Sequence, residues 1–351
     1  MNREAGLSTL GHIRGMRNRK QKWRLQGLVL GTLLLIALCV ASTFVGTRPI
    51  PAVVTLEALL RFDPTSTEHL LVYHLRVPRA LLAVLVGAAL GVAGVMMQAL
   101  TRNPLADPGI LGVNAGATLA IVSAIAFLGI SSVTAYMWFG LLGAAIAGAA
   151  VYSLGGIRRG MNPVRVVLAG SALTVVLLAL TQIITVNSDE QVFDQYRHWF
   201  VGSLQGRGHE VLLPVSLLIA VGLVASFWVA KALDTMTLGG DLSRSLGTSA
   251  RFVWLSSALI IVLLGGGATA AAGPISFVGL TAPHVARAIV GTDHRWVLPC
   301  SMLVSAILVV GADLLGRLVA RPGEVGVGIM VALIGGPFFV LLVQRWRMTR
   351  L

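Results

Sequence analysis

Charged residues are scarce in this sequence. They make up 12% of the 351 residues, whereas 56% are hydrophobic and the mean hydropathy is +0.84. This composition excludes an ordinary soluble domain. The apolar residues form long continuous runs between short polar breaks, and a bilayer core of roughly 30 Å needs about 20 apolar helical residues. The pattern therefore predicts an all-α polytopic membrane protein and not a barrel of short alternating strands.

Lysine is rarer still, and its scarcity excludes one way of using ATP. Only Lys20, Lys22 and Lys231 occur, and none is followed by Ser or Thr. A phosphate-binding loop of the G-x-x-x-x-G-K-[ST] kind needs that pair, because the lysine and the hydroxyl reach phosphate and magnesium. If transport is driven by ATP, another polypeptide must supply the energy.

The apolar runs hold almost no ionisable side chains near their middles. Asp313 is the nearest case, and it lies towards the end of a run, four residues before Arg317. Gradient-driven secondary transporters usually carry such groups at membrane depth, so their scarcity disfavours that class. No Ser/His/Asp set, carboxylate pair or H-E-x-x-H motif can be placed there either, which argues against an enzyme.

The only two cysteines, Cys39 and Cys300, each lie inside an apolar run. Neither has a metal-ligand spacing to another cysteine or to a histidine. We expect both to be buried free thiols, and we expect no metal site and no cofactor.

Ten apolar runs are predicted to form transmembrane helices. The eighth is the least regular, because Gly273-Pro274 opens it and Pro283 interrupts it. Small residues spaced three or four apart, such as Gly87, Gly91 and Gly94, predict closely packed helices. The predicted spans are 26–46, 80–101, 111–129, 135–155, 165–186, 211–230, 252–272, 275–290, 297–316 and 326–344.

Basic residues set the orientation. Seven of the 27 lie in the first 24 positions, before the first apolar run, and this is typical of a cytoplasmic anchor and not of a nucleic-acid-binding patch. A cleaved signal peptide is the alternative, but the run at 25–45 is long and Gly46-Thr47-Arg48-Pro49 is a poor cleavage site. With both termini in the cytoplasm, cytoplasmic segments hold 19 Lys/Arg and 5 Asp/Glu, and external segments hold 8 and 9.

This orientation divides the chain into three parts. Residues 1–25 form a basic cytoplasmic tail, residues 26–345 form a single transmembrane domain, and residues 346–351 form a cytoplasmic tail. The polar segment at about 232–250 has regularly spaced apolar positions and glycines at 239, 240 and 247. It predicts two short helices that end at Gly247. These would form an amphipathic surface element or a docking element for a cytoplasmic partner.

Several ordered motifs together resemble the iron-siderophore and cobalamin ABC importer permeases, over roughly residues 70–345. The motifs are Arg76-Val-Pro-Arg79, Arg102-Asn-Pro-Leu-Ala-Asp-Pro108, Leu111-Gly112, Gly116-Ala117, Leu168-Ala-Gly170, Trp199 with Gly202-Ser-Leu204, Leu238-Gly239, Leu246-Gly247, Gly273-Pro-Ile-Ser-Phe-Val-Gly-Leu280, Pro283-His284 with Arg287, Asp293-His-Arg295, Asp313 with Arg317, and Gly335-Gly-Pro-Phe-Phe339.

The resemblance implies a permease of the bacterial inner membrane that works inside a larger assembly. A second permease subunit, in a homo- or heterodimer, would form the pathway with this chain. Two cytoplasmic ATPase subunits would dock below, and an extracytoplasmic binding protein would deliver the cargo. The segment at 232–250 would be the ATPase coupling loop, with the residues Leu238, Gly239, Gly240, Asp241, Arg244, Leu246 and Gly247.

The resemblance also implies roles for three external arginines and for one loop. Arg76, Arg79 and Arg317 match arginines that meet acidic residues of the binding protein. The alternatives are an i, i+4 ion pair of Arg317 with Asp313 and interfacial snorkelling of Arg76 and Arg79. A cytoplasmic gate would include Asn162, Pro163 and Val164. His284 and Arg287 are predicted to form a local hydrogen-bonding pair.

The function expected from these patterns is inward transport of an intact ferric siderophore by alternating access. The stretch from Asn103 to Ala117 is most similar to catecholate-siderophore permeases. Cobalamin and haem are alternative cargoes. A gradient-driven secondary transporter and a structural membrane scaffold are alternatives of other classes.

Overall fold

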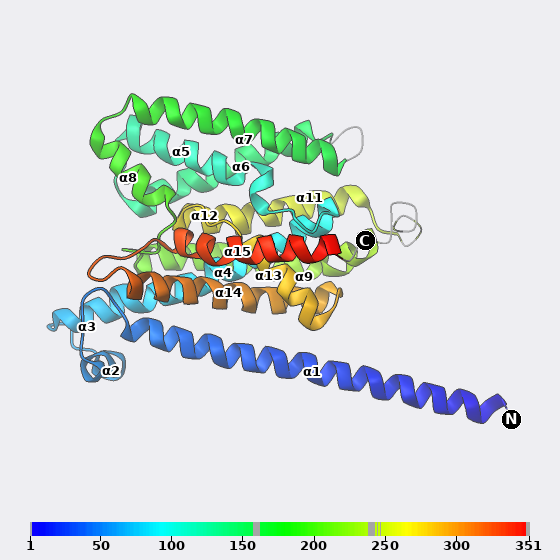
Figure 1. Ribbon diagram of the computed structural model, residues 1–351. Helices are drawn as coiled ribbons and strands as arrows, with labels where there is room; N and C mark the ends of the chain where they lie inside the picture. The colour runs from blue at the N-terminus through cyan, green and yellow to red at the C-terminus, as the bar shows by residue number, and fades with distance from the viewer. Residues whose placement is uncertain (1, 157–161, 238–242, 244, 246, 349–351) are drawn as a thin grey trace.

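Helices form all the regular structure in the part of the chain that this computed structural model describes, residues 2–156, 162–237, 243, 245 and 247–348. Each of the ten predicted spans coincides with a helical segment, which confirms the all-α class (Figure 1). The segments are α1 (Asn2–Phe44), α4 (Val77–Thr101), α5 (Val113–Leu128), α6 (Val133–Leu154), α7 (Pro163–Val186), α9 (His209–Thr237), α11 (Ala250–Ile261) continued by a π turn (Val262–Gly266) and α12 (Gly267–Ala272), α13 (Val278–Val290), α14 (His294–Val319) and α15 (Val327–Met348).

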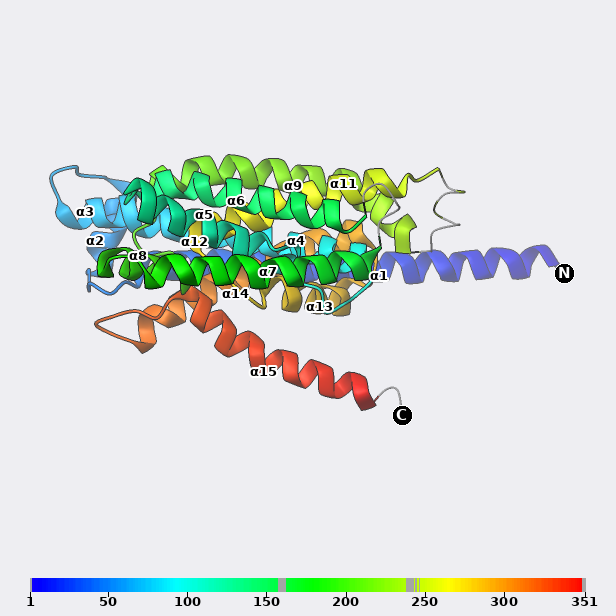
Figure 2. The same cartoon turned by 90° about the horizontal axis from the view of Figure 1, so that it is seen from above.

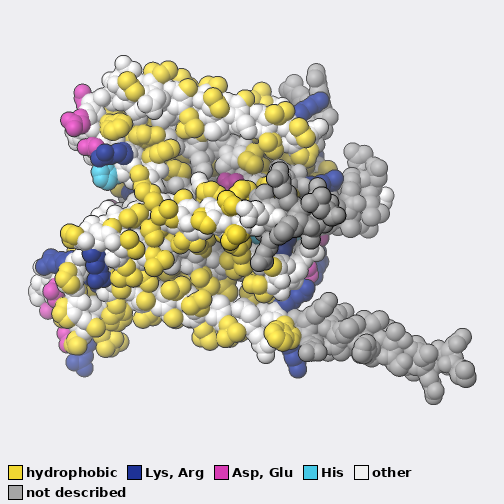
Figure 3. Space-filling view, in the orientation of Figure 1, with side chains coloured by type: hydrophobic (Ala, Val, Ile, Leu, Met, Phe, Trp, Pro, Cys, Tyr) yellow, Lys and Arg dark blue, Asp and Glu magenta, His cyan; other side chains and the backbone are white. Residues whose placement is uncertain are grey.

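The lengths and composition of these helices suit a membrane. Seven of the described helices are long and apolar enough to cross one, and three shorter apolar helices, at Val113–Leu128, Val278–Val290 and Val327–Leu341, match the remaining predicted spans. In Figure 3 the hydrophobic side chains form a broad band, and most charged side chains gather at its two ends. The number of ten crossings and their direction stay predictions.

One end of the bundle carries short helices that the sequence did not predict. These are α2 (Ala52–Leu60), α3 (Thr67–Leu71) and α8 (Glu190–Phe200), and Figure 1 shows them at the same end. A π-helical turn at Val72–Arg76 joins α3 to α4, so the chain is helical without interruption from Thr67 to Thr101. We call this end of the bundle the α3 end.

Helix α4 forms the centre of the bundle, where α14, α13 and α9 pack against it. Its glycines permit this packing. A Cβ on Gly87 would meet the backbone of Ala306, one on Gly91 would meet Ser305, and one on Gly94 would clash with the carbonyl of Gly279. The predicted close approach of helices at these small residues is therefore confirmed.

Helices α7 and α15 lie at the periphery. In α7 only Val166, Gly170, Thr181 and Thr185 are buried. The contacts of α15 are mainly with α14 and α13, and Figure 2 shows it leaning away from the other helices towards its carboxyl end. Both helices therefore present long apolar faces outside the bundle of this chain.

The predicted irregularity around span eight is confirmed. Gly273 and Phe277 have positive φ angles of 79° and 68°, and α13 starts only at Val278. Glycine is required at position 273, because an added Cβ would meet the carbonyl of Trp199 and the backbone of Gly202. Within this non-helical stretch Gly273 and Ile275 are buried, whereas Ser276 is exposed.

The two cysteines are free, as predicted. Cys300 is buried in α14, whereas Cys39 in α1 is only half-buried. The difference follows from the position of α1, which packs along α14 on one side and leaves the rest of its surface open.

Candidate functional site

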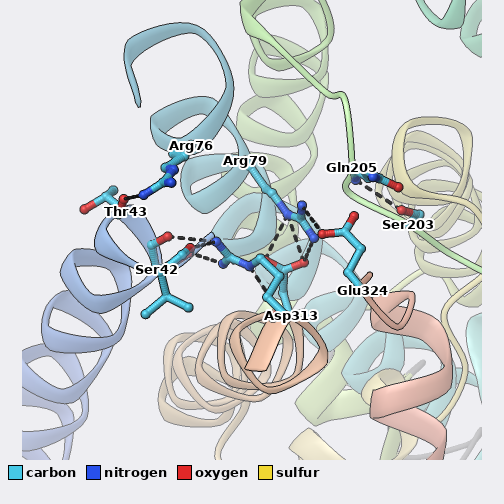
Figure 4. A network of polar contacts seen from close by, with 10 residues as sticks. Ser42, Thr43, Arg76, Arg79, Ser203, Gln205, Asp313 and Glu324 are labelled. Atoms are coloured by element: carbon cyan, nitrogen blue, oxygen red, sulfur yellow. Dashed lines mark hydrogen bonds and ion pairs between the residues drawn. The ribbon is translucent and has the colours of Figure 1, made fainter. Parts of the chain in front are cut away.

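Five charged side chains form a cluster at the α3 end (Figure 4). Arg76 lies in the π turn, Arg79 in the first turn of α4, Asp313 and Arg317 near the end of α14, and Glu324 in the loop before α15. We call this set the arginine cluster. It joins three regions that are far apart in sequence, because α1 also ends beside it and contributes Ser42.

Arg317 and Asp313 form the sealed part of the arginine cluster. Their side chains are only 2% and 1% exposed, and the Arg317 Nη2 donates to the Asp313 Oδ2 at 2.8 Å. The same guanidinium donates to the carbonyl of Ser42 at 2.8 Å and to its hydroxyl. The i, i+4 ion pair, which was the alternative to a docking role for Arg317, is therefore present.

Arg79 connects the sealed part to Glu324. Its Nη2 donates to the Asp313 Oδ1 at 2.7 Å, its Nε lies 3.1 Å from both carboxylate oxygens, and its Nη1 donates to the Glu324 Oε2 at 2.9 Å. The Arg79 side chain is 12% exposed. Charge-assisted bonds of this length are stronger than neutral ones, so Arg79 fastens α4 to both α14 and the loop before α15.

Arg76 closes the end of α1. Its guanidinium donates to the carbonyl oxygens of Thr43, Phe44 and Arg48 at 3.2, 3.1 and 2.6 Å. Carbonyls at a helix end lack partners within the helix, and a cation there satisfies them. An added Cβ at Gly46 would lie 2.7 Å from the Arg76 Nη2, so the guanidinium would have to shift away from these carbonyls.

The three arginines predicted to dock a binding protein are therefore bound within this chain. Arg76 is 8% exposed, so neither it nor Arg79 snorkels freely at the interface. A cavity of about 300 Å³ nevertheless opens onto the cluster, and its lining includes Arg48, Arg76, Arg79, Arg317 and Glu324. We call it the arginine pocket. Four cations line it and one carboxylate, so its field favours an anion.

A second cavity at the α3 end has a volume of about 640 Å³ and lies between α8, the start of α6 and the 203–207 segment. Arg207, which is 5% exposed, lines it and donates from Nη1 to the Tyr136 hydroxyl at 3.2 Å. Gln205 lines both this cavity and the arginine pocket. The 203–207 segment therefore separates the two.

At the opposite end of the bundle, α13 is clamped to the end of α4. Arg287 donates from Nη2 to the Gln98 Oε1, and the His284 ring bonds to the carbonyl of Pro104 at 2.8 Å. Instead of the local pair predicted for His284 and Arg287, these bonds join each side chain to a different residue at or after the end of α4. In the same loop the Asp107 carboxylate accepts from the Gly109 amide at 2.8 Å, and burial raises the pKa of this carboxyl.

The end of α9 is tied to α4 and α14 at the same place. Arg102, which ends α4 with a φ of 50°, donates to the carbonyl of Met236 at 2.8 Å. The ring of His294 at the start of α14 pairs with the Asp234 carboxylate. A cavity of about 740 Å³ lies among these side chains. The end of α9 is thus bonded to both α4 and α14.

The predicted coupling loop begins directly after this junction. Leu238, Gly239, Gly240, Asp241, Arg244 and Leu246 lie outside the described residues. Gly247 has a φ of 77°, and the Thr248 amide donates to the carbonyl of Ser243 at 3.0 Å. This is the left-handed ending expected for a helix that stops at Gly247.

The predicted gate residues form the start of α7. The Asn162 side chain accepts from the Val164 amide at 2.9 Å, Pro163 occupies the first turn, and Val164 is exposed. Asparagine as the N-cap with proline after it is a favoured helix start. The local structure thus accounts for the residue types, and the gate role stays a prediction.

Sequence reasoning missed Glu324, Ser42, Gln98 and Arg207. Each bonds to a residue far away in sequence, as in the pair of Arg79 and Glu324, which lie 245 positions apart. Glu324 follows a Pro-Gly turn and has no periodic pattern around it. Only its charge near the end of an apolar span could have marked it.

Comparison with known proteins gives consistent matches along almost the whole chain. A sequence profile of the FecCD transport family matches residues 34–345. The chain is 43% identical to the probable siderophore transport system permease protein YfiZ of Bacillus subtilis, over 82% of this chain and 86% of that protein. It is 42% identical to the ferric enterobactin transport system permease protein FepD of Escherichia coli, over 90% and 94%.

A solved structure matches as well. It is a metal-chelate type ABC transporter in an inward-facing conformation, with a TM-score of 0.79 and 28% sequence identity. The match covers 92% of this chain and 99% of that chain.

Proposed function

Because the chain belongs to the FecCD transport family, we propose that it is the membrane-spanning permease subunit of an ATP-driven importer and that it carries a ferric siderophore inward. The observation that carries this proposal is the match to siderophore permeases at 42–43% identity over most of both chains. The lack of a phosphate-binding lysine motif supports placing ATP hydrolysis on a separate chain. No chemistry on the cargo is required of this subunit.

A second permease subunit is expected to cover the faces of α7 and α15. The exposed face of α7 includes Ser171, Ala172, Ala179 and Gln182 between its larger apolar residues. Small and polar side chains are favoured where transmembrane helices pack together and are disfavoured against lipid. We therefore expect the pathway to lie between the two subunits at this face. Small, weakly polar residues there would let the chelate pass without tight binding.

The ATPase subunits are expected to act through the segment after α9. This segment starts beside the contacts of Arg102 with Met236 and of His294 with Asp234. These contacts join the last turn of α9 to α4 and α14. A movement of the loop by the ATPase would therefore be transmitted to α4 and α14 through them. The assignment of the gate loop and that of the coupling loop both come from the family resemblance.

The extracytoplasmic binding protein is expected to place an acidic side chain in the arginine pocket. Its four lining cations favour a carboxylate, and a guanidinium can bind one in a bidentate manner. Of the three arginines predicted to dock the binding protein, Arg79 is the most exposed. Arg48, which also lines the pocket, lies at the exposed surface beside it. The interaction should weaken as salt rises.

Reconstitution of the complete transporter in proteoliposomes tests the function. Candidate ATPase and binding-protein chains are those that co-purify with the permease or are encoded beside it. Uptake of a ferric catecholate siderophore should need ATP and the binding protein, and cobalamin and haem serve as competing cargoes. ATP-independent uptake by this chain alone would overturn the proposal. Preferred uptake of haem or cobalamin would support the assignment as an importer permease but show that its cargo is not a siderophore.

The docking assignment has its own test. Arg79→Gln should weaken binding of the loaded binding protein, with the largest loss at low salt. Arg61→Gln, at an exposed arginine on the same end and outside the pocket, is the matched control. Unchanged affinity and salt dependence for Arg79→Gln would show that the pocket is not the docking site.

A further inference from the structure

Glu324 differs from the other carboxylate of the arginine cluster. Asp313 is held by two arginines through both of its oxygens. Glu324 accepts one hydrogen bond, from the Arg79 Nη1 to its Oε2, and among the described residues its buried Oε1 has no hydrogen-bond partner. A buried acceptor without a partner is costly. Glu324 is therefore the weakly held member of the cluster.

Glu324 also occupies the place that an incoming carboxylate would need. It lines the arginine pocket, and Figure 4 shows its carboxylate against Arg79 on the side away from Ser42. Its side chain is 8% exposed, so it covers part of the Arg79 guanidinium without being sealed as Asp313 is. A second carboxylate cannot bind beside it without like-charge repulsion. An anion that binds Arg79 itself would therefore replace Glu324 there.

The position of Glu324 connects this exchange to α15. The next residue, Val325, donates its amide to the carbonyl of Gly316 in α14 at 3.1 Å, and the Gly328 amide donates to the carbonyl of Gly202 at 3.0 Å. Glycine is needed at position 328, because an added Cβ would meet Val201 and Gly202. The start of α15 is thus held by two backbone bonds, by the ion pair of the preceding Glu324, and by the packing of the buried Val327 and Val331. Only the ion pair can be exchanged by a ligand.

We propose that Glu324 is an internal stand-in for the acidic side chain of the binding protein: docking displaces it from Arg79 and frees the start of α15 to pivot about its two backbone bonds. This inference rests on the docking role proposed above and adds a specific competitor to it. The displaced carboxylate enters solvent, so its burial cost is relieved. Docking at the α3 end is then coupled to the helix that leans away from the bundle.

The decisive variant is Glu324→Gln, because the amide keeps the size of the side chain and can still accept from Arg79 without competing as an anion. The full transporter is tested with the binding protein that supports uptake in the proteoliposome assay. Its affinity should tighten by roughly three- to tenfold, a change of about the size that removing one competing charge produces. The affinity should also depend more steeply on salt, since docking then gains an ion pair instead of exchanging one.

Glu57→Gln is the matched control, since Glu57 is exposed at the same end and does not line the pocket. It removes the same charge and should leave affinity nearly unchanged. If both variants tighten binding equally, the effect is a general surface charge effect and the inference is wrong. If Glu324→Gln binds unchanged or more weakly, or fails to fold, Glu324 is a structural ion pair and the inference is also wrong.

Comparing Arg79→Gln with Glu324→Gln distinguishes the docking role of the arginine pocket from the stand-in role of Glu324. Loss of docking in Arg79→Gln with no change in Glu324→Gln would remove the stand-in role and leave the docking site intact. Unchanged docking in Arg79→Gln would contradict both the docking site and the stand-in role of Glu324.

A second readout follows α15 itself. Spin labels at Leu333 on α15 and Leu318 on α14 are both at exposed positions. In Glu324→Gln without binding protein, the distance distribution should shift towards the one that the unchanged chain shows when docked. An unchanged distribution would contradict the proposed release of α15.

Discussion

Helices α4 and α7 are both long and apolar, yet they have opposite environments. In the most apolar window of the helix that ends with α4, 83% of the residues are buried, against 11% in α7. The difference lies in the small residues. In α4 they face Ala306, Ser305 and Gly279 within this chain, whereas in α7 small residues such as Ser171 and Ala179 remain exposed. The comparison separates a central layer, which is packed within this chain, from a periphery that is exposed on this chain and for which we propose a second subunit.

Asp313→Asn should cause the largest change, because it tests the charged end of the central layer. The substitution leaves Arg79 and Arg317 buried with one carboxylate fewer. Removal of one partner of a buried ion pair costs about 3–5 kcal/mol. Thermal unfolding of the detergent-solubilised transporter, monitored by size-exclusion chromatography, measures the loss. Stability equal to that of the unchanged chain would mean that the cluster does not fasten α14 to α4.

Gly94→Ala should come next, since an added methyl group has no room against the carbonyl of Gly279. Overpacking of a tight contact costs up to about 3 kcal/mol. Gly311→Ala in α14 is the control, because nothing lies within 4 Å of a Cβ built there. The same unfolding assay should show a clear loss for the first variant and none for the second. Equal stability of the two variants would contradict close packing at the centre.

The sequence predicted the central layer better than the charged clusters. Ten apolar runs and the glycines of α4 carry their information locally, so the spans and their packing could be predicted. The short helices α2, α3 and α8 have 9, 5 and 11 residues, too few for a membrane-spanning run, and they were missed. The partners of Arg76 and Arg79 depend on where α1 and α15 lie, which no local pattern encodes. The sequence named Arg76, Arg79 and Arg317, which the structure brings together at one end of the bundle, and it omitted Glu324. Their docking role stays a prediction.

Ser171→Trp tests the periphery. A large ring on the exposed face of α7 should hinder packing of the second subunit and weaken pairing by about tenfold, or about 1.4 kcal/mol. Leu217→Trp on α9, at a position that is 69% exposed, should leave pairing intact. Subunit stoichiometry in nanodiscs, counted by single-molecule photobleaching, checks both. Normal pairing of the Ser171 variant would mean that this face of α7 is covered by lipid.

Leu217→Ala should have the smallest effect. The side chain is mostly exposed on a helix face for which we propose no partner, so its removal should change stability by about 0.5 kcal/mol or less. Unfolding and uptake assays together check this. A large loss of stability or of uptake would show that this face of α9 also packs against a partner.

The central claim is that docking of the binding protein lets α15 move relative to α4, and distances between spin labels test it most directly. Leu81 and Ile289 report on α4 and α13, while Leu81 and Leu341 report on α4 and α15, and all three side chains are exposed. Between the resting transporter and the one trapped with binding protein and ATP, the Leu81–Ile289 distance should stay constant and the Leu81–Leu341 distance should change. A changed Leu81–Ile289 distance, or a constant Leu81–Leu341 distance, would contradict the account.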